Sequence, residues 1–141
     1  MPNLIHPVDS RLLHRELAQA ALTATTTLGT YNQRTAMRTS YVTQIIMEAI
    51  KVSAGNELYT VVVEVSNDSF TTVEVAAILS LGHTSVRIGG APSNAAADTR
   101  QFYWTTEVNG VVYKDWRIRV IMAGTSPSLT AAAFTAPNNN F

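Results

Sequence analysis

Few residues in this sequence are of the types that catalyse reactions or hold metals, and none is spaced as a catalytic motif. The histidines are His6, His14 and His83, and no HExxH or HxH spacing connects them. The chain has no cysteine, which excludes thiol nucleophiles, disulfides and thiolate zinc sites together. A GxSxG elbow and a GxxxxGK(S/T) phosphate loop are both missing. We therefore predict no catalytic residue, no metal site and no cofactor.

Three glutamates, Glu57, Glu64 and Glu74, are the residues from which a pair of glycosidase carboxylates could be drawn. Glu64 and Glu74 lie among alternating apolar and polar residues, which is typical of the solvent face of a strand. The favoured interpretation is a polar outer sheet face, so we expect neither an enzyme nor a small-molecule substrate.

Aromatic residues cluster near the end of the chain, where Trp104, Tyr103 and Trp116 could form a platform for sugar rings. Alternation along a strand places Trp116 on one face and both Arg117 and Arg119 on the other. That pattern is typical of a sheet with a polar outer face rather than of a nucleic-acid groove. Core packing is therefore the favoured role of these aromatic rings, and a sugar platform is the alternative.

The composition indicates a single domain with an unusually uncharged surface. Among 141 residues, 46% are hydrophobic and 14% are charged, with a formal net charge of zero. Soluble domains average roughly 25% charged residues, so this surface is covered by Thr, Ser and Asn or by another protein. The charge balance points to no nucleic-acid partner. We expect no membrane segment and no signal peptide, because neither a long apolar run nor a basic n-region followed by an apolar stretch occurs.

Alternation predicts strands along most of the chain after residue 39. Tyr59, Val61, Val63 and Val65 share one face, which indicates a half-buried strand. Residues 40–52 have helical spacing but are rich in β-branched side chains, and we interpret them as a strand. Further strands are expected at 71–81, 84–88, 100–108, 111–122 and 128–136, with a loop at 89–98.

The dipeptide Asn109-Gly110 is the strongest hairpin signal in the chain. Hydrophobic register favours a three-residue loop from Val108 to Gly110, with Gly110 at positive φ. This register places Trp104 opposite Lys114, and Phe102 opposite Trp116.

Together these signals predict an all-β fold, an antiparallel jelly-roll-like sandwich with an N-terminal arm. We divide the chain into an arm (1–38), the sandwich (39–136) and a polar tail (137–141). Residues 11–22 favour a short helix capped by Asp9 or Ser10, and an extended arm is the open alternative. The sandwich strands are expected to begin near Tyr41.

The arm carries four arginines against two acidic residues and is therefore net +2. Arginine makes paired bonds to carboxylates, so these residues are candidate contacts with an acidic partner surface. They are Arg11, Arg15, Arg34 and Arg38.

Two stretches, "AGNELYTVVVEVSNDSF" (54–70) and "VNGVVYKDWRIRVIMAGTSPSLTAAAFTA" (108–136), give the chain a family likeness. With the Gly/Pro/Asn loop between them, they resemble jelly-roll cement, or decoration, proteins of tailed bacteriophage heads. The resemblance covers roughly residues 40 to 136. It is carried by Gly55, Glu57, Tyr59, Ser66, Asn67, Asp68, Arg117, Arg119, Gly124, Thr125 and Ser128.

This resemblance implies a structural, non-enzymatic protein that binds and stabilises the major capsid shell. It further implies a homodimer or homotrimer on the exterior of the virion, assembled in the host cytoplasm. Two alternatives remain: a carbohydrate- or receptor-binding sandwich, and a structural protein of the tail or the head–tail junction.

Overall fold

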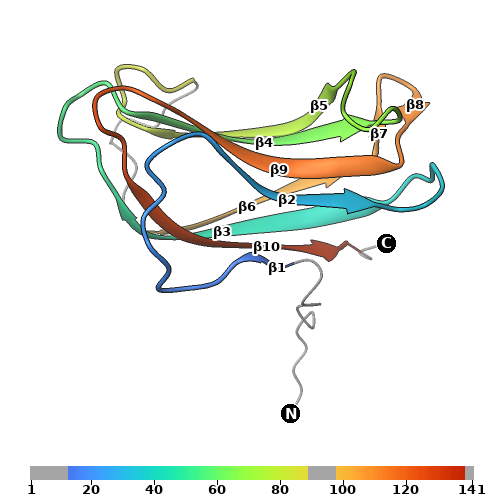
Figure 1. The fold of residues 1–141 in the computed structure, drawn as a ribbon, viewed down its shortest axis with the longest axis horizontal. Helices are drawn as coiled ribbons and strands as arrows, with labels where there is room; N and C mark the ends of the chain where they lie inside the picture. Colours follow the sequence, from blue (N-terminus) through green and yellow to red (C-terminus); the bar gives the residue numbers. More distant parts are fainter. Residues whose placement is uncertain (1–12, 89–97, 139–141) are drawn as a thin grey trace, which may run out of the picture.

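Two antiparallel four-stranded sheets pack face to face in the computed structural model, which describes residues 13–88 and 98–138 (Figure 1). Sheet A has the order β1-β10-β3-β6, sheet B has the order β2-β9-β4-β5, and β7 and β8 form a small hairpin. The strands are β1 (Leu13–Arg15), β2 (Thr26–Asn32), β3 (Ser40–Ile50), β4 (Leu58–Ser66), β5 (Glu74–Gly82), β6 (Asp98–Thr105), β7 (Glu107–Val108), β8 (Val111–Val112), β9 (Asp115–Ala123) and β10 (Leu129–Pro137). The predicted all-β sandwich is confirmed.

Strand pairs nest inside one another along the chain. β1 pairs with β10, β2 with β9, β3 with β6, and β4 with β5. Two further pairings, β10 with β3 and β9 with β4, join these pairs into the two four-stranded sheets. As a result, the first and last described strands lie side by side in sheet A.

The core lies between the sheets because alternate residues of each strand turn inward. In β3, the buried side chains of Tyr41, Thr43, Ile45 and Met47 alternate with more exposed neighbours. This pattern confirms a strand over most of residues 40–52, where the spacing alone would also fit a helix. The inward side chains predicted for β4 are buried, but the expectation of a half-buried strand is wrong, because Val62 and Glu64 on its other face are only 4% and 5% exposed.

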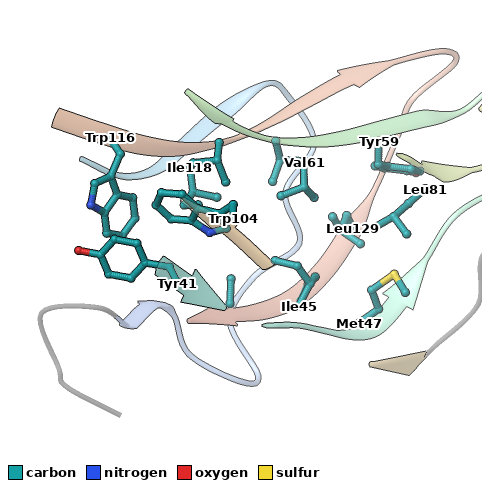
Figure 2. Close-up of a cluster of buried hydrophobic side chains, with 14 of the residues drawn as sticks. Tyr41, Ile45, Met47, Tyr59, Val61, Leu81, Trp104, Trp116, Ile118 and Leu129 are labelled. Atoms are coloured by element: carbon teal, nitrogen blue, oxygen red, sulfur yellow. The ribbon is translucent and has the colours of Figure 1, made fainter. Parts of the chain in front are cut away.

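Aromatic rings fill one end of this core (Figure 2). The rings of Tyr41 and Trp104 stack with centroids 4.7 Å apart, and Trp104 meets Trp116 edge-on at 4.9 Å. Trp104 comes from sheet A and Trp116 from sheet B, so their contact joins the two sheets. Aliphatic side chains occupy the rest of the core, including Val61, Leu81, Ile118 and Leu129.

The sandwich begins much earlier in the chain than the sequence indicates. Strand β1 starts at Leu13 and β2 at Thr26, and they pair with β10 and β9. The expectation that the strands begin near Tyr41 is therefore wrong. Tyr31 and Leu28 of β2 pack against the core, which accounts for the place of this segment in the fold.

Residues 13–22 contain no helix, so the helical interpretation of 11–22 is wrong for the described part. The order of the sheets explains this, because β1 has to pair with β10 along the edge of sheet A. At the other end, β10 continues to Pro137, the first residue of the predicted tail. Residues 139–141 lie outside the described residues.

The Asn109-Gly110 turn is tighter than predicted. Val108 pairs directly with Val111, so the loop has two residues and the three-residue loop is wrong. Asn109 and Gly110 both have positive φ, 52° and 81°, as a type I′ turn requires. Positive φ at Gly110 is confirmed.

Register within the longer predicted hairpin is also wrong. Trp104 lies opposite Tyr41, and Phe102 opposite Thr43, because β6 pairs with β3 in sheet A. Strand β9, which carries Trp116, belongs to sheet B. The two segments therefore separate immediately beyond the tight turn, and Trp104 does not pair with Lys114.

The predicted strand at 84–88 is absent, and these residues form turns and bends. They follow Gly82, whose φ of 118° ends β5. All but the last residue of the expected loop at 89–98 lies outside the described residues, and Asp98 begins β6.

Candidate protein interface

The outer face formed by β10, β3 and β6 of sheet A is nearly free of charge. Because Tyr41, Thr43, Ile45 and Met47 point inward, the alternate residues of β3 and their partners on β10 and β6 point outward. We name this set the sheet A face, and Glu48 is its one charged member. The members are Ser40, Val42, Gln44, Ile46, Glu48, Thr99, Gln101, Tyr103, Thr105, Ala132, Phe134 and Ala136.

A large aromatic side chain stands on this face among small ones. Tyr103 is 57% exposed, whereas Ala132 and Ala136 are almost fully buried and add little height. Gln101 donates a hydrogen bond from Nε2 to the Tyr103 hydroxyl, at 3.1 Å. Aromatic enrichment and charge depletion distinguish the centres of protein–protein interfaces from the rest of a protein surface. The sheet A face has that chemistry.

The outer side of sheet B is different, because it carries a cluster of salt-bridged side chains. Glu64 Oε2 lies 2.6 Å from Arg117 Nη2, and Glu64 Oε1 lies 2.9 Å from Arg119 Nη1. Burial alone would raise the pKa of Glu64, but hydrogen bonds from the two guanidinium groups outweigh it and hold the pKa below its usual range. The Phe70 ring lies 4.5 Å from the Arg117 guanidinium carbon. These charges are satisfied within the chain.

The candidate glycosidase carboxylates do not form a pair with free oxygens. Glu57 is fully buried and accepts hydrogen bonds from the N–H groups of Ala54 and Gly55, at 2.8 and 3.1 Å. Glu64 is occupied by its two arginines. Glu74 lies exposed on β5. The expected solvent-face position is therefore confirmed for Glu74 and wrong for Glu64, which is 5% exposed beneath its two arginines.

The predicted contact arginines lie in different parts of the fold. Arg15 is bound within its own sandwich, where Nε donates to the Ala131 carbonyl at 2.9 Å and Nη2 to that of Ala20. Arg34 and Arg38 are exposed in the loop after β2, and Arg38 Nε lies 3.4 Å from a Glu107 carboxylate oxygen. The fourth, Arg11, lies outside the described residues.

The aromatic residues proposed for a sugar platform do not form one. Trp104 and Trp116 are 4% and 1% exposed, so their rings are unavailable to a ligand, and core packing is confirmed for both. Tyr103 is the exposed member of the set.

The two histidines of the described residues, His14 and His83, contact hydroxyl groups of the chain, and His6 lies outside the described residues. His14 lies between the hydroxyls of Tyr31 and Thr135, and His83 Nδ1 lies 2.7 Å from Ser85 Oγ. Within residues 13–88 and 98–138, no three His, Asp or Glu side chains are grouped to hold a metal ion. No helix in this part of the chain is long and apolar enough to cross a membrane.

Residues that carry the family resemblance have contacts that hold the fold. Tyr59 donates from its hydroxyl to the carbonyl of Lys51 at 2.7 Å, and accepts from the N–H of Ser128. Asn56 accepts from the N–H of Thr125 through Oδ1, at 3.0 Å. These bonds join the β3–β4 and β9–β10 loops at one end of the sandwich. The motif therefore describes the architecture, and binding has to be argued from the surfaces.

No family model, no curated protein and no solved structure matches this chain.

The sequence analysis missed the sheet A face, although one signal for it was present. The outward positions 42, 44 and 46 and the small residues 132 and 136 carry no charge.

Proposed function

We propose that this protein is an accessory structural protein, a cement or decoration protein, of a tailed bacteriophage head. It binds the major capsid protein on the exterior of the virion and stabilises the shell without catalysing a reaction. The observation that carries this proposal is the sheet A face, on which Glu48 is the one charged member and Tyr103 is exposed. A sheet face of this chemistry suits a broad protein contact better than a small ligand.

The proposal extends the sandwich to a jelly roll. Eight strands in two four-stranded sheets, with the first strand paired to the last and inner pairs nested between them, suit that architecture. Fold alone does not assign function, so the resemblance of residues 40–136 to head decoration proteins supplies the class of partner.

Attachment in this proposal uses two surfaces of the chain. The sheet A face supplies the apolar contact, and Arg34 and Arg38 supply paired bonds to carboxylates of the capsid surface. Arg15 is left out of the contact set, because its guanidinium already bonds the chain's own carbonyl groups. Self-association as a dimer or trimer follows the closed symmetry usual for such proteins.

Mass spectrometry of purified virions tests the assignment. We expect the protein at a near-stoichiometric ratio to the major capsid protein. Recovery only from infected-cell lysate would reject a virion role, and a few copies per particle would indicate a tail or head-completion protein instead.

Co-sedimentation with capsids that lack the protein tests the surface. We expect Tyr103→Lys to weaken binding by about tenfold or more, because it places a charge within an apolar contact. The matched control is Thr30→Lys, which adds the same charge to an exposed position on sheet B. Equal binding by both variants and the unaltered protein would contradict the proposed face.

A further inference from the structure

A hollow of about 290 Å³ lies between the β4–β5 loop and the short segment that connects β8 to β9. These segments lie at the same end of the sandwich as the β7–β8 hairpin (Figure 1). The hollow is lined by Asn67, Asp68, Thr72, Val73, Glu74 and Tyr113. It involves neither the sheet A face nor the core tryptophans.

The walls of this hollow are fixed by hydrogen bonds from Asn67 and Asp68. Asn67 Nδ2 donates to the Val112 carbonyl, and its Oδ1 accepts from the N–H of Lys114, both at 3.0 Å. These two bonds connect the β4–β5 loop to the segment that carries Tyr113. Asp68 Oδ1 accepts from the N–H of Thr72 at 2.8 Å, which closes the loop on itself. The hollow is therefore preformed, which lowers the entropic cost of binding.

Three groups in the hollow are available to a ligand. Within the described residues, the Glu74 carboxylate and the Tyr113 hydroxyl make no hydrogen bond. Hydrogen bonds from Thr72 and Ser66 lower the pKa of Asp68, so this carboxylate stays ionised at neutral and mildly acidic pH. An ionised carboxylate only accepts hydrogen bonds. Val73, which is 39% exposed, adds an apolar patch beside these acceptors.

We infer that this hollow binds a neutral hexose, as a free sugar or as the end of a glycan. Sugar hydroxyls donate to the carboxylates of Asp68 and Glu74, and a C–H face of the ring packs against Tyr113 and Val73. Two carboxylates repel an anionic ligand. A calcium ion needs six to eight oxygen ligands, and one Asp68 oxygen is already occupied by donors of the chain.

This inference is independent of attachment to a capsid, and it replaces the buried tryptophans as the place where a sugar would bind. The hollow is small and open to solvent, so we expect millimolar affinity for a monosaccharide. This multivalent step alone rests on the proposed function, in which many copies on one particle turn such weak sites into firm attachment.

Heteronuclear NMR titration of the full chain with glucose, galactose, mannose and N-acetylglucosamine tests the site. We expect saturable shifts of the backbone amides of Thr72, Val73, Glu74 and Tyr113 with at least one of these sugars. Two variants remove one polar group each without changing the core: Glu74→Gln and Tyr113→Phe. Each should weaken the sugar affinity about threefold to tenfold.

Matched controls use the same substitutions elsewhere. Glu16→Gln and Tyr103→Phe alter an exposed glutamate and an exposed tyrosine, and both should leave the affinity unchanged. Retained binding in Glu74→Gln and Tyr113→Phe overturns the assignment of this hollow. So does the absence of saturable shifts with every sugar, or a response of these amides to calcium chloride or a lysine-containing peptide alone.

Discussion

His14 and Thr135 lie 121 positions apart in the chain, and His14 Nε2 is 2.6 Å from Thr135 Oγ1. This contact fastens β1 to β10. The other ring nitrogen of His14 lies 2.6 Å from the Tyr31 hydroxyl, so the imidazole also connects sheet A to sheet B. Thr135 in turn meets Thr43, which accepts from the indole N–H of Trp104 at 2.8 Å. A polar chain thus crosses all four strands of sheet A.

The pH dependence of stability should report this histidine. Burial lowers the pKa of His14 from 6.5 to about 4, so the folded protein keeps the ring neutral where the unfolded chain protonates it. The contribution of neutral His14 to the free energy of unfolding is fully present above about pH 6.5. It declines as the pH falls toward 4, by at most about 3 kcal/mol. Urea unfolding from about pH 7 to about pH 5 should show the decline.

Two substitutions separate His14 from the acidic groups that titrate lower. His14→Gln should flatten the pH dependence above about pH 5, while His83→Gln, at a half-buried loop position beside Ser85, should retain it. An unchanged slope in His14→Gln would show that this imidazole is not the group responsible.

Glu64 should be worth far more to the fold than a surface acid. Glu64→Gln leaves Arg117 and Arg119 without their counter-charge on sheet B, and should lower the free energy of unfolding by about 2–4 kcal/mol. The control is Glu107→Gln, which breaks the exposed pair with Arg38 and should cost less than about 1 kcal/mol. Chemical denaturation measures both, and equal losses would contradict the difference in burial.

Gly82 lies where a side chain has no room. A Cβ there would approach the Glu57 carbonyl oxygen to 2.3 Å, and the residue has a φ of 118°. We expect Gly82→Ala to cost about 3 kcal/mol or more, because the obstacle is backbone. Gly110→Ala is the control, since its φ is 81° but no atom lies within 4 Å of the added Cβ. Gly110→Ala should cost about 1–2 kcal/mol, because it meets only the strain of a left-handed backbone conformation. Thermal unfolding of the two variants measures the difference.

The central strands could be predicted from the sequence because they are buried on a regular face. β4 lies between β9 and β5, and its alternating valines indicate the strand and its inward side. The edge strand β1 and its neighbour β2 in the chain could not be predicted well. Thr26, Thr27 and Gly29 give β2 little apolar alternation, and its pairing with β9 spans most of the chain.

Local turn signals could not give the register of Trp104 and Trp116. The apolar face was assigned correctly, since both rings are buried and touch each other. They meet across the core from opposite sheets, and no local pattern distinguishes that arrangement from a hairpin pair. The sheet A face was missed for a related reason, because a sheet face with few charges has no residue type that stands out.

Removal of residues 1–38 should unfold the protein, because it deletes β1 and β2 from the two sheets. The Tyr31 ring stacks on Trp116 at 4.2 Å, and β9 would lose its partner along one edge. In the full chain, Tyr31→Ala should by itself cost about 3 kcal/mol or more, since it removes a packed ring and the hydroxyl next to His14. Tyr103→Ala, at an exposed tyrosine on the sheet A face, should cost less than about 1 kcal/mol. Circular dichroism and urea denaturation measure these changes, and a shortened chain that melts cooperatively at the original temperature would mean that β1 and β2 are dispensable.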